Sequence, residues 1–117
     1  MTIKRVYIAG PITLGDQFRN CGKAMEAFHV LRDKGFAPFC PHTSGLLQMI
    51  QERTWEDWLD YDEEWIKVCH AVLRLPGESR GADRECAFAE EIGIPIFHSI
   101  EALEAQANNA LLEAPEK

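Results

Sequence analysis

The sequence predicts a small three-layer α/β sandwich with a parallel sheet of four to five strands, and three observations support this fold class. Short apolar runs alternate with segments whose apolar residues recur at helical spacing. Glycine or proline stands at the end of most of these segments, which indicates turns between them. The first strand, helix and strand also fit within about 40 residues, a length that suits a right-handed parallel crossover unit.

Four short apolar segments are predicted strands. Pro11, Pro41 and Pro76 follow the first three, and Gly93 precedes the fourth, so each strand is bounded by a residue that interrupts regular structure. In chain order the predicted strands span residues 3–9, 36–40, 71–75 and 95–97.

Five segments are predicted helices, and three of them begin at side chains that cap helix N-termini. These caps are Asp16, Thr54 and Ser79, while Gly35 ends the first helix. The predicted helices span about residues 16–34, 46–50, 55–68, 79–91 and 99–112. Residues 1–112 are therefore expected to form a single flavodoxin- or Rossmann-like domain, followed by a polar tail at 113–117.

The composition fits one ordinary globular domain of 117 residues and 13.3 kDa. Twelve Lys plus Arg against 19 Asp plus Glu give a formal net charge of -7, which argues against a nucleic-acid polymer as partner. No apolar run approaches the roughly 20 residues that a membrane-spanning helix needs.

The apolar part of residues 1–10 is too short for a signal peptide, so we expect a cytoplasmic location. The four cysteines are widely spaced with no CxxC, so we expect buried, reduced thiols and no metal site. Neither GxGxxG nor a P-loop occurs, and we expect no cofactor.

Three predicted loops should meet at one edge of the sheet. Open parallel sheets bind ligands beyond the carboxyl ends of their strands. Residues 10–15, 41–44 and 76–81 all follow predicted strands at that edge. We therefore expect these loops to line one pocket.

Two acids stand on helix faces that the apolar pattern predicts to be buried. Glu85 shares a stripe of small residues with Ala82, and Asp62 interrupts a mainly aromatic stripe. A buried carboxylate is costly unless it is paired or used in chemistry. A proton donor beside a carboxylate that stays charged is the arrangement that cleaves glycosidic bonds. The nearby helix N-terminus is expected to help keep Glu85 ionised.

Structural roles are the alternative for the same acids, because buried carboxylates are often members of ion pairs. The candidate partners are Arg74 and Lys67 for Asp62, and Arg80 and Arg84 for Glu85.

Three further residues have both a structural and a functional interpretation. Tyr7 is either a core aromatic or a hydroxyl that orients a carboxylate at the pocket edge. Ser79 and Gly81 form either a plain turn and N-cap, or an anion site for a 5′-phosphate or a ribose hydroxyl.

Five short motifs occur along the chain. They are YIAGPI at 7–12, PH at 41–42, D-x-x-W at 62–65, S-x-G-x-x-x-E at 79–85 and GIP at 93–95. Their order and spacing resemble the nucleoside 2-deoxyribosyltransferase superfamily, and within it especially the 2′-deoxynucleoside 5′-phosphate N-hydrolases. The resemblance covers about residues 3–98.

The resemblance implies that Glu85 attacks the anomeric carbon, that Asp62 assists departure of the base and that Tyr7 positions Glu85. The substrate would be a nucleoside or a nucleoside 5′-monophosphate, hydrolysed if water is the acceptor and transferred if a second base is. A homodimer or larger assembly is also implied. The implied substrate-binding residues are Gly10, Pro11, Ile12 and His42 around the sugar and base, and Ser79 and Gly81 at the 5′ end.

One departure from the family pattern leaves a second function open. His70 stands where an aspartate usually precedes the third strand, and loss of that charge could weaken the catalytic network. The alternative function is a nucleotide-binding or sensing module with little or no turnover. A purely structural scaffold would leave the two buried acids unexplained.

Overall fold

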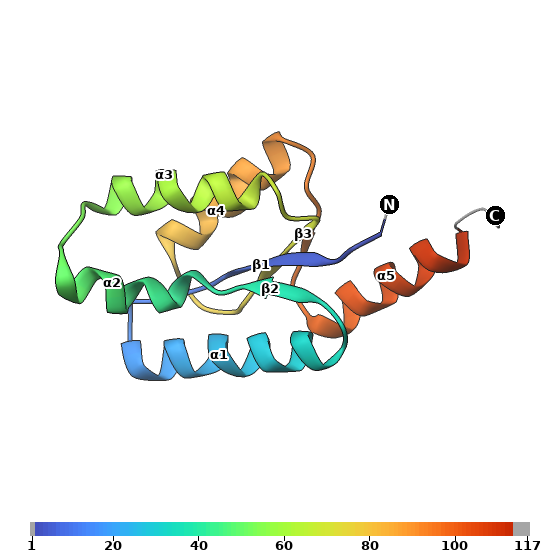
Figure 1. Ribbon diagram of the computed structural model, residues 1–117, viewed down its shortest axis with the longest axis horizontal. Helices are drawn as coiled ribbons and strands as arrows, with labels where there is room; N and C mark the ends of the chain where they lie inside the picture. The colour runs from blue at the N-terminus through green and yellow to red at the C-terminus, as the bar shows by residue number, and fades with distance from the viewer. Residues whose placement is uncertain (1, 114–117) are drawn as a thin grey trace.

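The computed structural model describes residues 2–113 and contains a parallel four-stranded sheet between two layers of helices (Figure 1). The predicted α/β fold class is confirmed, with four strands rather than five. The strands are β1 (Arg5–Ala9), β2 (Ala37–Phe39), β3 (Ala71–Arg74) and β4 (Ile96–Phe97). The helices are α1 (Gln17–Asp33), the 3-10 turn η1 (Pro41–Thr43), α2 (Ser44–Ile50), α3 (Trp55–Ile66), α4 (Arg80–Glu91) and α5 (Ile100–Glu113).

The strand order is β2-β1-β3-β4, so β1 and β3 form the centre of the sheet. Tyr7 on β1 pairs in register with Phe39 on one side and Val72 on the other. The chain leaves β1 toward one edge of the sheet and leaves β3 toward the other edge. A crevice is expected where such connections diverge, beyond the carboxyl ends of the two central strands.

Alternate residues of β1 face the two helical layers, because successive strand side chains point to opposite faces. Val6 and Ile8 pack in a core with α1 and α5. Tyr7 and Ala9 pack in a second core with residues of α3 and α4. Tyr7 therefore lies on the same side of the sheet as the helices that carry the two predicted acids.

The predicted helix caps are confirmed. The side chains of Asp16, Thr54 and Ser79 each accept a backbone N–H three residues later, at 3.0 to 3.1 Å. Gly35 follows α1 with a φ of 96°, a conformation that favours glycine. The short helix predicted at 46–50 is confirmed as α2, which begins two residues earlier than predicted and follows η1 directly.

The prediction that the tryptophans of α3 are buried is wrong for Trp55 and Trp65, which are exposed. The buried stripe of α3 contains Leu59, Asp62 and Ile66. Trp65 stacks on Phe39 of the edge strand β2, with ring centres 5.3 Å apart, and Trp55 is the first residue of α3.

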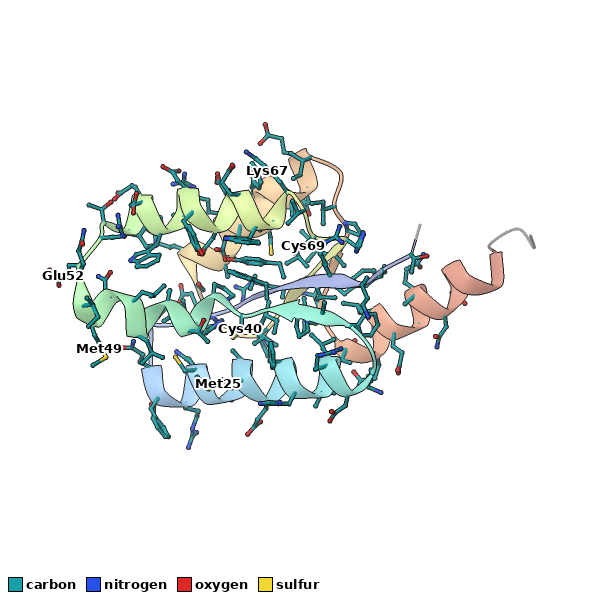
Figure 2. All side chains as sticks on the ribbon, viewed as in Figure 1. Met25, Cys40, Met49, Glu52, Lys67 and Cys69 are labelled. Carbon is teal, nitrogen blue, oxygen red and sulfur yellow. The ribbon has the colours of Figure 1, made fainter. Side chains whose placement is uncertain are left out.

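The four cysteines are free thiols, as predicted, but their predicted burial is wrong for Cys21 and Cys86. Cys40 and Cys69 lie in the interior (Figure 2), whereas Cys21 and Cys86 are half-buried. Between residues 2 and 113 there is no helix long and apolar enough to cross a membrane. Glu113, predicted as the start of the polar tail, is the last residue of α5, and residues 114–117 lie outside the described part of the chain.

Candidate functional site

A cavity of about 580 Å³ lies at the carboxyl edge of the sheet, where the loops after β1 and β3 meet α2, α3 and α4. Parts of all three predicted loop segments line it. Six of the nine predicted site residues are on its wall: Gly10, Ile12, Asp62, Ser79, Gly81 and Glu85. The two acids, which are 23 positions apart in the sequence, therefore share one cavity.

Glu85 is held in place by a hydrogen bond that joins helix and sheet. It lies on α4, six residues after the Ser79 cap, and is buried. The hydroxyl of Tyr7 donates to Glu85 Oε2 over 2.5 Å, and Tyr7 itself is fully buried on β1. A bond this short to a buried carboxyl group fixes the direction in which Glu85 points.

Asp62 approaches the cavity from α3 and is also buried. Its Oδ1 atom is shielded and has no hydrogen-bond partner among residues 2–113. Buried polar atoms are normally paired, so an unpaired carboxyl oxygen is a cost to the fold that packing alone does not explain.

Burial keeps a proton on this pair of acids. Burial raises the pKa of Glu85 to about 9, the hydrogen bond from Tyr7 opposes the rise, and the neighbouring Asp62 adds to it. Burial also raises the pKa of Asp62, and its contacts with Glu85 and Tyr7 partly offset that rise. The pKa of Tyr7 is raised by burial and by both acids. At neutral pH the pair therefore holds a proton on Glu85.

The expectation that the helix N-terminus keeps Glu85 charged is wrong for the resting protein. A helix dipole contributes at most about 2 kcal/mol, or about 1.5 pKa units. Full burial raises a carboxyl pKa by about 3–5 units, so desolvation outweighs the dipole at this position.

The ion-pair alternatives are also contradicted, because each candidate base interacts elsewhere. Arg74 binds Asp83 at 3.1 Å, and Lys67 binds Glu64 at 2.5 Å. Arg84 approaches Asp60 and Glu63 at 3.9 and 3.8 Å, and the guanidinium of Arg80 lies 5.4 Å from the centre of the Trp55 ring.

Pro11 and His42 are buried behind the cavity wall instead of forming part of it. Burial lowers the pKa of His42, so its ring is neutral and Nε2 donates to the Pro11 carbonyl over 3.1 Å. His42 therefore holds the loop after β1 in position. Cys40 Sγ lies 3.7 Å from His42 Nδ1, but no group of three potential metal ligands occurs in the described residues.

His70 lies at the other end of the sheet. Its Nδ1 accepts the backbone N–H groups of Lys4 and Arg5 at 3.1 and 3.0 Å, just before β1 and β3 begin. The predicted weakening of the catalytic network is therefore wrong, since a charge at this position would lie far from the cavity. His70 has a structural role in tying the two central strands together.

Several wall residues were not predicted as part of the site. Arg53 and Arg80 place two cations on a wall that also carries both acids, although the whole chain is acidic. Trp55 and Trp58 line the cavity next to Asp62. Their spacing of seven and four residues before Asp62 puts them on the same helix face, which was the available signal.

A comparison with known protein families matches residues 4–98 to the family described as "Domain of unknown function (DUF4406)". The chain belongs to this family. The matched region contains all nine predicted site residues. It nearly coincides with residues 3–98, over which the sequence resembles the nucleoside 2-deoxyribosyltransferase superfamily.

A solved structure shares the fold of this DUF4406 chain. It is a 2-deoxyribosyltransferase from the psychrotolerant bacterium Bacillus psychrosaccharolyticus, with a TM-score of 0.62 and 23% sequence identity. The match covers 79% of this chain and 69% of that chain. No curated protein matches the sequence. Because the family description assigns no activity, a functional conclusion depends on the geometry of the cavity.

Proposed function

We propose that this DUF4406 protein cleaves the N-glycosidic bond of a nucleoside or a nucleoside 5′-monophosphate by nucleophilic attack from Glu85. The observation that carries the proposal is the placement of two buried acids in one cavity, one of which is held by a buried tyrosine. The cavity has the size of a small-molecule site. The fold shared with a 2-deoxyribosyltransferase supports the same chemistry.

The reaction is a double displacement with retention of configuration. The Glu85 carboxylate attacks the anomeric carbon, and the bonding electrons of the C–N bond leave with the base. Asp62 gives its proton to the departing base. Water or a second base then attacks the same carbon, gives a proton to the Asp62 carboxylate and releases Glu85, which gives hydrolysis or N-deoxyribosyl transfer respectively.

The attack requires the shared proton to lie on Asp62. In the resting protein burial raises the pKa of Glu85 to about 9, so Glu85 holds a proton that ligand binding has to move to Asp62. A base nitrogen that accepts a hydrogen bond from Asp62 would favour this state. The hydrogen bond from Tyr7 would then stabilise the charged Glu85.

The other wall residues have binding roles in this proposal. Gly10 and Ile12 border the sugar and the base, and Ser79 and Gly81 hold the 5′ end at the start of α4. Pro11 and His42 support the first of these loops from behind.

The test is a panel of nucleosides and their 5′-monophosphates, incubated with the protein and analysed for free base by chromatography. Glu85→Gln should reduce release by at least about 10³-fold, and Asp62→Asn by about 10²–10⁴-fold. The matched control is Glu64→Gln, which changes an exposed acid of α3 that pairs with Lys67. Undiminished release by Glu85→Gln would exclude the covalent role.

A second candidate is a nucleotide-binding module without turnover, and the proton that Glu85 holds at rest favours it. A neutral carboxyl group binds a sugar hydroxyl but does not attack the anomeric carbon. Calorimetric titration that shows tight nucleotide binding, with no free base after prolonged incubation, would select this candidate over the enzyme.

A further inference from the structure

Three aromatic side chains from neighbouring elements stack in a row that ends at the buried tyrosine of the site. Tyr7 on β1 and Phe39 on β2 have ring centres 5.7 Å apart and ring planes inclined by 20°. Phe39 and Trp65 on α3 have ring centres 5.3 Å apart and planes inclined by 14°. We call these three residues the aromatic stack. Tyr7 is fully buried and Trp65 is 42% exposed, so the stack runs from the candidate site to the protein surface.

The stack limits the sideways movement of the Tyr7 ring. The register partners of Tyr7 in the sheet are Phe39 on one side and Val72 on the other. The Tyr7 hydroxyl lies on the long axis of its ring, so a tilt of that axis moves the hydroxyl away from Glu85, whereas rotation about the axis does not. The Phe39 ring blocks a tilt toward β2. Phe39 therefore helps to keep the 2.5 Å hydrogen bond between Tyr7 and Glu85.

Phe39 has support from the sheet on one side. Its strand, β2, has three residues, lies at the edge of the sheet and, among the described strands, pairs with β1. All three residues of β2 are half-buried. Proteins commonly cover an edge strand with a helix or a loop. Trp65 supplies such cover at Phe39, because its indole ring stacks on the Phe39 ring.

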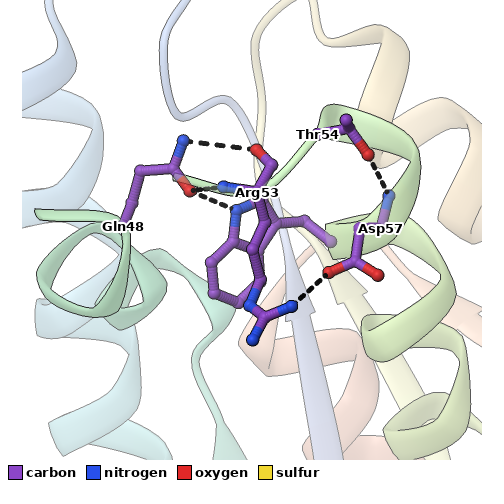
Figure 3. A network of polar contacts seen from close by, with 5 residues as sticks. Gln48, Arg53, Thr54 and Asp57 are labelled. Carbon is purple, nitrogen blue, oxygen red and sulfur yellow. Dashed lines mark hydrogen bonds and ion pairs between the residues drawn. The ribbon is translucent and has the colours of Figure 1, made fainter. Parts of the chain in front are cut away.

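Trp65 is also one of two anchors of α3. Near the start of the helix, Gln48 Oε1 accepts from Trp58 Nε1 over 2.6 Å and from the backbone N–H of Arg53 over 3.0 Å (Figure 3). Near the end of the helix, Trp65 lies against β2. Asp62 lies between the two anchors, three residues before Trp65 and next to it on the helix surface. The D-x-x-W spacing thus joins one acid of the site to an anchor of its helix.

We propose that Trp65 is a positioning residue, which acts through Phe39 to hold the Tyr7 hydroxyl against Glu85. Trp65 is not part of the cavity wall, so its effect on the site passes through other residues. Hydrogen bonds weaken steeply with distance and misalignment, and a small tilt of Tyr7 is therefore enough to weaken this bond. The effect of Trp65 on base release rests on the proposed function, whereas its effect on the hydrogen bond does not.

The protonation of Glu85 reports the position of Tyr7. The hydrogen bond from Tyr7 opposes the rise in the pKa of Glu85 that burial causes. If the Tyr7 hydroxyl moves away, the pKa of Glu85 therefore rises further. If removal of the Trp65 ring only admits water, the effect of burial shrinks and the pKa falls toward its ordinary value of 4.5. Positioning and simple shielding thus predict opposite shifts.

Two substitutions of Trp65 test the proposal, with the pKa of Glu85 followed through its carboxyl ¹³C resonance over a pH series. Trp65→Leu should raise this pKa by about 0.5 units or more, since a complete hydrogen bond to a charged group shifts a pKa by about 1–2 units. Trp65→Phe, whose ring can still stack, should keep the wild-type value. The matched control is Phe18→Leu, which removes a 91% exposed ring from α1 and should change nothing.

The double variant Tyr7→Phe/Trp65→Leu separates positioning from packing. If Trp65 acts through the Tyr7 hydroxyl, Trp65→Leu should have no further effect on the pKa of Glu85 once that hydroxyl is absent. On the substrate that the nucleoside and nucleotide panel identifies, Trp65→Leu should lower kcat about 2–10-fold, as expected for loss of one aromatic pair. KM should stay within about twofold of wild type, because Trp65 lies outside the cavity wall.

Circular dichroism and thermal unfolding show that each variant is folded before its pKa is compared. Three results would overturn the proposal: a pKa of Glu85 that stays the same or falls in Trp65→Leu, an equal rise in the Tyr7→Phe background, or a Trp65→Phe protein that matches Trp65→Leu. A wild-type protein that releases no base, but whose Glu85 responds to Trp65→Leu as predicted, would refute the proposed function and support the positioning role.

Discussion

At Glu85 two opposing effects determine the charge of the side chain. Burial favours the neutral carboxyl group, and the hydroxyl of Tyr7 favours the carboxylate by donating to it. Burial is the larger effect at rest. The catalytic proposal therefore depends on a side chain that is unstable in the charged form needed for attack.

Glu85→Gln should make the protein more stable at alkaline pH. The ordinary glutamate pKa of 4.5 rises to about 9 in the folded state, so between these values the folded protein binds more protons than the unfolded chain. Stability contributed by this group is therefore fully present below pH 4.5 and is lost as pH rises toward 9. Urea unfolding at pH 8 should show Glu85→Gln at least about 1 kcal/mol more stable than wild type, with no difference near pH 4.

The control is Glu91→Gln, which removes an exposed acid from the same helix. It should follow the pH dependence of the wild type. A Glu85→Gln protein that is less stable than wild type at pH 8 would show that the buried acid is charged.

Tyr7→Phe should slow base release while preserving the packing of the ring. The substitution removes the donor that opposes the raised pKa of Glu85, so this pKa rises further and less carboxylate is present. A hydrogen bond to a charged group contributes about 1.5–3 kcal/mol, which predicts a decrease in kcat of about 10–100-fold. Kinetics over a pH series should show the acid limb moved to higher pH. Tyr61→Phe, an exposed tyrosine on α3, should match the wild type.

At the scale of elements, the loop between β3 and α4 depends on Arg74. Its guanidinium donates to the carbonyls of Leu75 and Gly77 and to the side chain of Asp83. These contacts hold the segment that ends in Ser79, and hence the start of α4 on the cavity wall.

Arg74→Met should destabilise the protein by about 1–3 kcal/mol, because two carbonyls lose their donor. Asp83→Asn should cost less than about 1 kcal/mol, because the Asp83 side chain is mostly exposed. Thermal unfolding of both variants separates the two contributions. Equal losses would mean that the ion pair, and not the carbonyl contacts, holds the loop.

The local signals in the sequence predicted the elements well, because caps, glycines and short apolar runs act within a few residues. Asp16 and Thr54 cap their helices, and Glu85 and Asp62 both lie on buried helix faces. The shared cavity followed from the general rule on where parallel sheets bind ligands.

The errors arose where the outcome depends on contacts between distant residues. The partners of Arg74 and the position of His70 depend on how strands and loops come together. The charge of Glu85 depends on the depth of its burial, which helix periodicity does not report.

At the scale of the whole molecule, the candidate site forms beyond the carboxyl ends of β1 and β3. Tyr7 comes from β1, Asp62 from α3 and Glu85 from α4, and the cavity exists only when these elements pack around the sheet. The protonation of the pair is thus a property of the folded protein and would set the pH range of the proposed activity.

Base release should have a bell-shaped pH dependence, because the proposed reaction needs one proton on the two acids. Activity should fall at low pH, where both acids are protonated, with a midpoint above the ordinary aspartate pKa of 3.8 because the pKa of Asp62 is raised. It should also fall above about pH 9, where the pair loses its last proton. Initial rates between pH 4 and 10 check this, and a rate that still rises beyond pH 9 would contradict it.

The most direct measurement compares free-base formation by wild-type protein and by Glu85→Ala on the substrate that the nucleoside and nucleotide panel identifies, with added azide as an external nucleophile. If Glu85 attacks the sugar, the variant should be inactive alone, and azide should restore base release with formation of a glycosyl azide. Base release by the variant at the wild-type rate without azide would contradict attack by Glu85 and with it the proposed function.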